Sequence, residues 1–508
     1  MNPQNMPDLI RILPEVVLTI TGVLIMLFDA ALPATNNRRS LGWLGAVGVT
    51  AALWSSLIQL NLPPGTAFYR TVQTDPFSVF FHVLICGIVL ASILLSLDAL
   101  PANQHHRGEY FALMVLGAVG MCLMTSAVEL LVVFIALEIS SISTYILAGF
   151  RKHTGTGPEA AIKYFLLGSF ATGFLLYGVA LTFGATGTTQ INDIAAHIPA
   201  ASSQLVLAAF ALLMVGVLFK VSAAPFHVWT PDVYQGAPSP VVALMSTAPK
   251  AAAFALLIRL LYSSFPVLQP VWQPMLWIVA VLSMTVGNLA ALRQKNVKRM
   301  LAYSSIAHAG YLLAAFAGLG INAIASASFY VAAYAAMNVG IFAVLSIAAG
   351  PDEKLSVIED FRGFLFRAPL LGTLLIFFLA SLIGIPFTAG FFGKFYSFAT
   401  AIHGGAVWLG IIGLLNSGVA AAYYLGFAVK VAQPPAAGSA KLPAPELGVA
   451  VGLSLALATT ATLVLGIAPT RFLSAAQSGA TSFLPPVISD SVKPSTDVPD
   501  LSKVRWVR

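Results

Sequence analysis

Residues 212–240 read LLMVGVLFKVSAAPFHVWTPDVYQGAPSP, a stretch that begins as an apolar membrane helix and then departs from that pattern. Lys220 lies inside the apolar run, Pro225 interrupts it, and His227 and Asp232 follow before the next apolar run begins. An ionisable side chain at membrane depth costs at least about 2.5–3.5 kcal/mol and therefore indicates a function. Non-helical backbone survives at that depth only where protein or internal water satisfies its polar groups. The stretch therefore predicts a polar, hydrated pocket around Lys220.

The whole chain has the composition of a polytopic membrane protein. Of its 508 residues, 58% are hydrophobic and 9% are charged, and the mean hydropathy is +0.87, whereas soluble proteins carry about 25% charged residues. The formal charge of +7 comes mainly from short loops, which fits orientation in a lipid bilayer and not nucleic-acid binding. Cys86 and Cys122 lie in apolar segments and form no iron–sulfur or disulfide motif, and no P-loop or GxGxxG follows a strand. We therefore expect no cofactor and no metal in this chain.

The apolar segments predict an all-α fold with about fourteen transmembrane helices, since one crossing needs roughly 20 mostly apolar residues. The segments 204–235 and 367–401 are interrupted, so helices 7 and 12 are expected to be broken. The predicted crossings lie near 9–32, 41–60, 76–98, 108–125, 127–150, 159–185, 204–235, 238–262, 272–293, 297–318, 322–349, 367–401, 405–432 and 446–470.

The two interruptions have similar sequences. LFKVSAAPF at 218–226 and LASLIGIPF at 379–387 align without gaps at Leu, Pro and Phe. The two helices lie five apart in order, so one runs inward and the other outward. This arrangement is typical of inverted repeats with broken helices at a transport site.

Loop charge predicts the orientation of the chain in the membrane. The short loops of one parity hold only Arg70 and Arg259, whereas the basic residues gather in the others. The positive-inside rule then places the basic side in the cytoplasm and both termini outside. We expect the tail after residue 471 to be irregular. The basic loop residues are Arg38, Arg39, Arg107, Arg151, Lys152, Arg293, Lys295, Lys298, Arg299, Lys354, Arg362, Arg367, Lys430 and Lys441.

Among the ionisable residues of the predicted crossings, four stand out as the strongest candidates for function: Glu138, Lys220, Lys250 and Lys394. Either membrane face is about ten residues from Lys250, farther than a lysine stem can reach. Static ion pairs, or capping of freed carbonyls at the two breaks, are the alternative readings. Lys163 lies near a helix start, where it can reach the surface, and is a weaker candidate.

These residue types suit a proton relay. Burial weakens the hold of a lysine on its proton and a nearby carboxylate strengthens it, so a lysine with a movable partner has two proton affinities. We predict that Glu138 tunes Lys220. His227 and His308 are candidate carriers between lysines, because imidazole titrates near neutral pH. A hydrogen bond to a neighbouring helix is the alternative role for each histidine.

Three motifs resemble the antiporter-like membrane subunits of proton-pumping NADH:quinone oxidoreductase, respiratory complex I. They are FKVSAAPFHVWTPDVYQGAPSPVVALMSTAPKAAAFALL, KNVKRMLAYSSIAHAGY and GIPFTAGFFGKFYSF. Three flanking segments are similar to the subunit N branch in particular: PDLIRILPEVVLTITGVLIMLFDA, AIKYFLLGSFATGFLLYGVALTFGATGTT and FRGFLFRAPLLG. The resemblance covers nearly the whole chain to about residue 470.

The resemblance implies fourteen helices with two inverted five-helix repeats, helices 4–8 and 9–13. The corresponding regions are 1–107 for helices 1–3, 108–265 and 266–435 for the repeats, 436–470 for helix 14 and 471–508 for the tail. The family has functional residues on helices 5, 7, 8 and 12 and a histidine after the first break. By the same resemblance, these positions correspond in that order to Glu138, Lys220, Lys250, Lys394 and His227. Lys394 disfavours subunit M, and the absence of a long lateral helix disfavours subunit L.

The implied function is proton translocation driven by electron transfer from NADH to quinone in other subunits. NAD, FMN, iron–sulfur clusters and quinone would then lie in partner subunits, which include sister antiporter-like and small hydrophobic subunits. The expected location is the bacterial inner (plasma) membrane. Two alternatives stay open: a subunit of a multisubunit sodium/proton antiporter, and a structural subunit whose buried charges only hold helices together.

Overall fold

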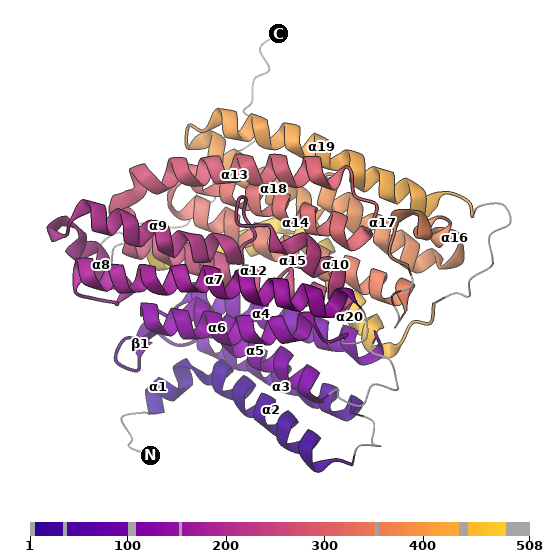
Figure 1. Ribbon diagram of the computed structural model, residues 1–508, viewed down its shortest axis with the longest axis horizontal. Coiled ribbons are helices and arrows are strands. Elements are labelled where there is room, and N and C mark those ends of the chain that lie inside the picture. Colours follow the sequence, from indigo (N-terminus) through magenta and orange to yellow (C-terminus); the bar gives the residue numbers. More distant parts are fainter. Residues whose placement is uncertain are drawn as a thin grey trace, which may run out of the picture.

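The computed structural model describes residues 6–33, 38–99, 108–151, 155–350, 353, 355–435 and 445–483. Figure 1 shows long helices lying side by side, with α2 and α3 at one edge of the bundle and α19 at the other. The hairpin strand β1 and the short helix α8 lie at the same end of the bundle as α1, and α16 lies at the opposite end. Four of the basic loop residues, Arg107, Lys152, Lys354 and Lys441, lie outside the described residues.

The predicted all-α membrane fold is confirmed. Within the described ranges, thirteen helical spans are long and apolar enough to cross a membrane, and the interrupted pair α17–α18 supplies one more crossing. The crossings are α2 (Leu13–Ala31), α3 (Arg39–Gln59), α4 (Pro76–Ala99), α5 (Gly108–Ser126), α6 (Leu130–Ala148), α7 (Thr156–Thr186), α9 (Ser203–Lys220), α11–α12 (Ser239–Met245 and Ala248–Arg259), α13 (Gln269–Ala291), α14 (Val297–Ala314), α15 (Gly320–Ala349), α17–α18 (Pro369–Ile383 and Ala389–His403), α19 (Val407–Ala432) and α20 (Val449–Ile467).

The predicted break in the seventh crossing is present. Helix α9 ends at Lys220, and the short helix α10 (Trp229–Gly236) follows after a non-helical segment. Neighbouring groups satisfy the freed backbone: the amide of Ala224 donates to Ser283 Oγ at 2.8 Å, and Trp229 Nε1 donates to the carbonyl of Phe219 at 3.2 Å. Protein thus replaces the solvent that a membrane cannot supply.

The predicted break in the twelfth crossing is also present. Helix α17 ends at Ile383, and Gly384 adopts a φ of 93°, a conformation that glycine reaches without a steric penalty. Helix α18 then begins at Ala389. Lys394 Nζ donates to the carbonyls of Leu382 and Ile383, both at 2.9 Å, and so satisfies the end of α17.

A third interruption was not predicted. The segment 238–262 reads as one apolar run, but α11 ends at Met245 and α12 begins at Ala248, two residues before Lys250. Proline at position 249 lies in the first turn of α12, where its missing N–H costs nothing. Thr247 Oγ1 donates to the carbonyl of Ala243 at 2.6 Å and satisfies part of the interrupted helix.

Several short elements outside the crossings carry no strong hydropathy signal. They are α1 (Met6–Arg11), β1 (Gly65–Ala67), β2 (Val72–Thr74), α8 (Ile191–His197), α16 (Phe364–Arg367) and α21 (Pro469–Ala480). Strands β1 and β2 form an antiparallel hairpin.

The expectation of an irregular tail was wrong for its first part. Helix α21 runs to Ala480, and a 3₁₀ turn covers Thr481–Phe483. The helix is short and half polar, so it fails the length rule for a crossing, but it buries Pro469, Ala476 and Ala480 and contacts α4 and α15. Tertiary contact of one apolar stripe therefore makes it helical. Residues 484–508 lie outside the described residues.

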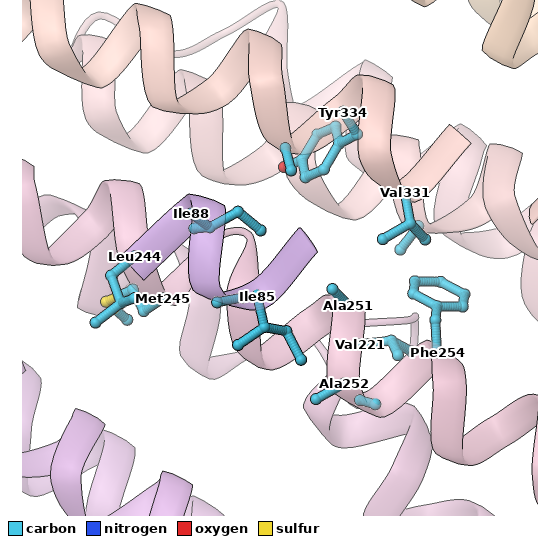
Figure 2. Packing of buried hydrophobic residues seen from close by; sticks show 14 of the residues in the cluster. Ile85, Ile88, Val221, Leu244, Met245, Ala251, Ala252, Phe254, Val331 and Tyr334 are labelled. Atoms are coloured by element: carbon cyan, nitrogen blue, oxygen red, sulfur yellow. The ribbon is translucent and has the colours of Figure 1, made fainter. Parts of the chain in front are cut away.

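The core of the bundle surrounds the crossing formed by α11 and α12. This crossing is completely buried, whereas most residues of α2 and α19, on the outside of the bundle, are exposed or only partly buried. Figure 2 shows side chains of α4, α11, α12 and α15 gathered in one cluster, among them Ile85, Met245, Ala251 and Tyr334. Lys250 immediately precedes Ala251, so the central lysine lies in the most enclosed part of the protein. The boundaries proposed at 107, 265, 435 and 470 stay predictions.

Candidate functional site

Lys220 is buried at the end of α9 and has no hydrogen-bond partner within the described structure. Its side chain is 3% exposed, and its ammonium lies 5.5 Å and 5.8 Å from the ring centres of Tyr145 and Tyr164. Glu138, on α6, is near enough for its charge to interact with that of Lys220. No direct ion pair joins the two side chains among the described residues, and Glu138 Oε1 is also buried without a partner. Aromatic faces therefore surround this ammonium, and the nearby Glu138 carboxylate does not pair with it directly.

Other buried polar groups near the first break are unpaired as well. They are Ser222 Oγ and Thr230 Oγ1, in and just after the break, and Tyr145 Oη, whose ring lies beside the Lys220 ammonium. Buried polar groups in proteins nearly always bond to protein or to ordered water. These hydroxyls therefore make the surroundings of Lys220 suitable for internal water, as the sequence predicts.

Lys250 lies on α12 with 4% of its side chain exposed, so it does not reach the membrane surface. Its ammonium donates to Ser305 Oγ on α14 at 2.5 Å. Ser305 Oγ also forms a hydrogen bond with the hydroxyl of Tyr234 on α10 at 3.2 Å. Helices from three parts of the chain therefore meet at one buried hydroxyl. Among the described residues, no carboxylate forms a hydrogen bond with this lysine.

His308 lies one turn beyond Ser305 on α14 and is 1% exposed. Its Nδ1 is 2.9 Å from the hydroxyl of Tyr330, and its Nε2 is 3.2 Å from the hydroxyl of Tyr424, which also bonds to Ser304. A neutral imidazole donates from one nitrogen and accepts at the other. A Tyr–His–Tyr chain can therefore accept a proton at one end and release one at the other.

Lys394 lies on α18 just after the second break and is 5% exposed. Its three ammonium hydrogens have three acceptors: the carbonyls of Leu382 and Ile383 and, at 2.8 Å, Ser417 Oγ. The ammonium also lies 5.0 Å from the ring centre of Tyr311, on the same helix as His308. Lys250 bonds to Ser305 and Lys394 lies beside Tyr311, both on α14, so this helix connects the surroundings of the two lysines.

The two weaker candidates lie closer to the edge of the bundle. His227, in the first break, is partly exposed, and its Nδ1 is buried without a partner. Lys163 is 43% exposed and forms ion pairs of 2.7 Å with both Glu159 and Asp232. Asp232 is also paired with Arg299. Lys163 thus belongs to a partly exposed ion network and does not share a hydrogen bond with the buried lysines.

One residue interpreted as a loop charge is in fact buried. Arg259 is the last residue of α12 and is 2% exposed. Its Nη2 donates to both oxygens of Asp75 at 3.0 Å, and its Nε donates to the carbonyl of Thr125 at 2.7 Å. The sequence missed this pair because the two residues lie 184 positions apart. The position of Arg259 only nine residues after Lys250 was the available signal that it lies within the same crossing.

Local sequence places only some hydroxyls beside His308, namely those of Tyr303, Ser304, Ser305 and Tyr311 in AYSSIAHAGY. Tyr234, Tyr330 and Tyr424 come from other helices and carry no local signal that connects them with this histidine. Their contribution depends on tertiary contacts that place α10, α15 and α19 beside α14.

Known proteins share this arrangement of helices and its sequence. Residues 127–420 match the family described as NADH:quinone oxidoreductase/Mrp antiporter, TM. A curated relative from Koribacter versatilis (strain Ellin345), named NADH-quinone oxidoreductase subunit N 2, is 50% identical over 481 residues, which is 93% of this chain and 97% of the relative.

Solved structures agree with the sequence relatives. A chain of respiratory complex I from Thermus thermophilus with bound aureothin is 36% identical with a TM-score of 0.78, covering 92% of this chain and all of that chain. A chain of the Mrp complex from Dietzia sp. DQ12-45-1b has a TM-score of 0.79 at 19% identity, over 92% of this chain and 97% of that chain, and shows the shared fold alone. This chain therefore belongs to the NADH:quinone oxidoreductase/Mrp antiporter transmembrane family, among the relatives named subunit N.

Proposed function

We propose that this chain is a proton-translocating subunit of an NADH:quinone oxidoreductase, in which electron transfer in other subunits drives proton movement through its buried side chains. The observation that carries the proposal is Lys250, buried in the fully enclosed crossing and bonded to Ser305 beside the His308 chain. Two relatives named subunit N of this enzyme, 50% and 41% identical over nearly the whole chain, support an association with the redox subunits of such an enzyme.

The buried residues have distinct roles in this proposal. Lys220 holds a proton whose affinity changes with the distance of Glu138, because no fixed bond joins the two. Lys250 exchanges protons with the hydroxyl network at Ser305, and the tautomers of His308 relay them toward Lys394. Internal water at the first break connects Lys220 to Lys250. His227 and Lys163 transfer protons between the membrane surface and these buried residues.

The proposal extends to the surroundings of the chain. The protein is a multi-pass membrane protein of a respiratory complex, and we place it in the bacterial inner (plasma) membrane with both termini outside. Regions 108–265 and 266–435 would form the two inverted repeats, because the broken crossings are the seventh and the twelfth. NAD, FMN, iron–sulfur clusters and quinone would be held by partner subunits, next to sister antiporter-like and small hydrophobic subunits.

Substitution of Lys250 by Met tests the proposal. Met fills a similar volume but carries no proton, so we expect a complex of normal abundance with at least about tenfold lower coupled proton transport. Complex abundance is measured on native gels, and proton transport and NADH:quinone turnover are measured in membrane vesicles. Lys430→Met is the control, because Lys430 pairs with the exposed Glu359 at the molecular surface.

The alternatives give different results in the same assay. A purely structural role for the buried charges predicts that Lys250→Met lowers complex abundance while the remaining complex pumps normally. A sodium/proton antiporter subunit would instead purify with small hydrophobic partners and no redox centre, and its proton movement would depend on external Na⁺. Recovery with flavin, iron–sulfur signals and NADH:quinone activity would contradict that alternative.

A further inference from the structure

Glu353 lies just beyond the end of α15 and, in the described structure, forms no hydrogen bond with Lys220, Lys250 or Lys394. It forms hydrogen bonds with groups from distant parts of the chain. Its carboxylate accepts hydrogen bonds from the amide and the hydroxyl of Ser239, both at 2.6 Å, from Lys298 Nζ at 2.6 Å and from Arg151 Nη1 at 2.8 Å. These four residues line a cavity of about 280 Å³ at the end of the bundle that carries the basic loops. The side chain of Glu353 is only 12% exposed.

Two of the partners of Glu353 lie at the starts of the two crossings that meet at Lys250. Ser239 is the first residue of α11, which is followed after a short interruption by α12 with Lys250, and Lys298 is in the first turn of α14, which carries Ser305. Lys250 follows Ser239 in the same crossing, beyond the interruption between α11 and α12, and Ser305 lies about 10 Å from Lys298 along α14, at 1.5 Å per residue. The Glu353 carboxylate thus joins the ends of the same two helices whose side chains form the Lys250–Ser305 hydrogen bond.

Neighbouring groups stabilise the ionised form of Glu353. Burial alone would raise the pKa of its carboxyl, but Lys298, Ser239 and Arg151 outweigh burial and lower the pKa below its usual value. The carboxylate therefore stays ionised at neutral pH. The stability that its ion pairs contribute to the fold is lost only when the pH falls through that lowered pKa. Without this charge, the ammonium of Lys298 and the guanidinium of Arg151 would face each other beside the start of α11.

We propose that Glu353 is a positioning residue for proton transfer, which fixes the starts of α11 and α14 relative to each other and thereby the contact between Lys250 and Ser305. The inference rests on the proposed function, because it assigns Glu353 an effect on a proton-transfer contact that it does not touch. A second bond agrees with this role: Lys298 Nζ also donates to the carbonyl of Ala237, two residues before α11, at 2.8 Å.

A local stabilising role would also explain the ion pairs, so the test must measure coupling to Ser305. The variants are Glu353→Gln, Ser305→Ala and the double variant, each in the full complex in membrane vesicles. We expect Glu353→Gln to lower proton transport per NADH oxidised about two- to tenfold, as for other residues that act through packed elements. In the Ser305→Ala background, Glu353→Gln should cause no further loss, because the contact that it positions is already absent.

Glu359→Gln is the matched control, since Glu359 is an acid on the same side of the bundle that pairs with Lys430 at an exposed position. It should leave proton transport unchanged. Lys298→Met is the alternative variant if the Glu353→Gln complex does not assemble. It removes the ion pair between Glu353 and α14 and leaves the carboxylate bonded to Ser239 and Arg151. It too should have no further effect in the Ser305→Ala background.

Independent, multiplicative losses from Glu353→Gln and Ser305→Ala would overturn the inference, and so would loss of abundance with normal transport in the remaining complex. The outcome for Lys250→Met is separate. If that variant pumps normally, the proposed function fails, whatever the result at Glu353.

Discussion

Lys220, Lys250 and Lys394 are all buried, but the protein satisfies their ammonium groups to different degrees. Lys394 has three hydrogen-bond acceptors, Lys250 has one side-chain hydroxyl, and Lys220 has no acceptor among the described residues. Desolvation of an ammonium is costly unless hydrogen bonds replace water. The three sites therefore differ in how readily they keep a charge, which is what a directed proton path requires.

His308 tests the relay at the scale of one residue. In His308→Gln, a side chain that still forms hydrogen bonds replaces one that can change tautomer, so coupled proton transport should fall at least about tenfold. Proton transport and NADH oxidation in vesicles measure the effect. Tyr330→Phe removes only the partner of Nδ1 and should cause a smaller loss, and equal transport in His308→Gln and the parent protein would rule out the relay through this residue.

Arg259 tests the buried ion pair for stability. In Arg259→Met, the carboxylate of Asp75 would be buried without its cation, which typically costs about 3–5 kcal/mol. We expect a lower unfolding midpoint in detergent and lower abundance of the complex, and partial recovery in the double variant with Asp75→Asn. The exposed pair of Arg70 and Asp193 is the control, and Arg70→Met should change little. An unchanged midpoint in Arg259→Met would contradict the structural importance of the pair.

Interrupted helices are the elements that distinguish this bundle from a set of simple crossings. In both predicted breaks, a buried group bonds to the freed carbonyls of the preceding helix: Trp229 in the first and Lys394 in the second. A lysine that satisfies backbone carbonyls costs less to bury than an isolated one. The capping of carbonyls expected as an alternative for Lys394 is therefore present, and it coexists with the contact to Tyr311 on the helix of His308.

Gly390 tests the packing of the second break. Helix α18 passes so close to α17 that a Cβ at position 390 would overlap the carbonyl oxygen of Ser381. Gly390→Ala should therefore destabilise the protein by about 1–3 kcal/mol or more, as overpacked cores do. Abundance and thermal unfolding of the complex measure this cost. Gly418→Ala, on α19, is the control, because a Cβ at that position would meet no neighbouring helix or side chain within 4 Å. Equal stability of the two variants would contradict close packing at the break.

The whole molecule has a predicted orientation that cysteine labelling can test. Both native cysteines are buried and give little background. Tyr69 lies in the hairpin turn and is 99% exposed, whereas Glu359 lies on the side of the basic loops and is 58% exposed. A membrane-impermeant maleimide should label Tyr69→Cys in cells with a permeabilised outer membrane, and label Glu359→Cys only after the inner membrane is opened. The reverse pattern would invert the assigned orientation.

Much of the fold and part of the candidate site could be predicted from local sequence. Lys220 and Lys394 stand beside prolines within long apolar runs, so the breaks and the buried lysines were recognisable together. The interruption before Lys250 was missed because Thr247 and Pro249 lie in a segment, 238–262, that is long and apolar enough overall for one unbroken crossing, and a single proline is compatible with a continuous membrane helix. The burial of Arg259 was missed for a related reason: a charge near a segment end looks the same whether it faces solvent or a partner inside the bundle.

Local sequence was enough to predict the membrane class, the fourteen crossings, the two breaks and the buried lysines, because the energy of placing each segment in a bilayer depends mainly on its own side chains. Which of those groups meet depends on how the helices pack. Lys250 and Ser305 are 55 positions apart, His308 and Tyr424 are 116 apart, and Glu353 and Arg151 are 202 apart. Hydrogen bonds require contact within about 3 Å, and helix packing, which no local pattern specifies, brings such distant residues together.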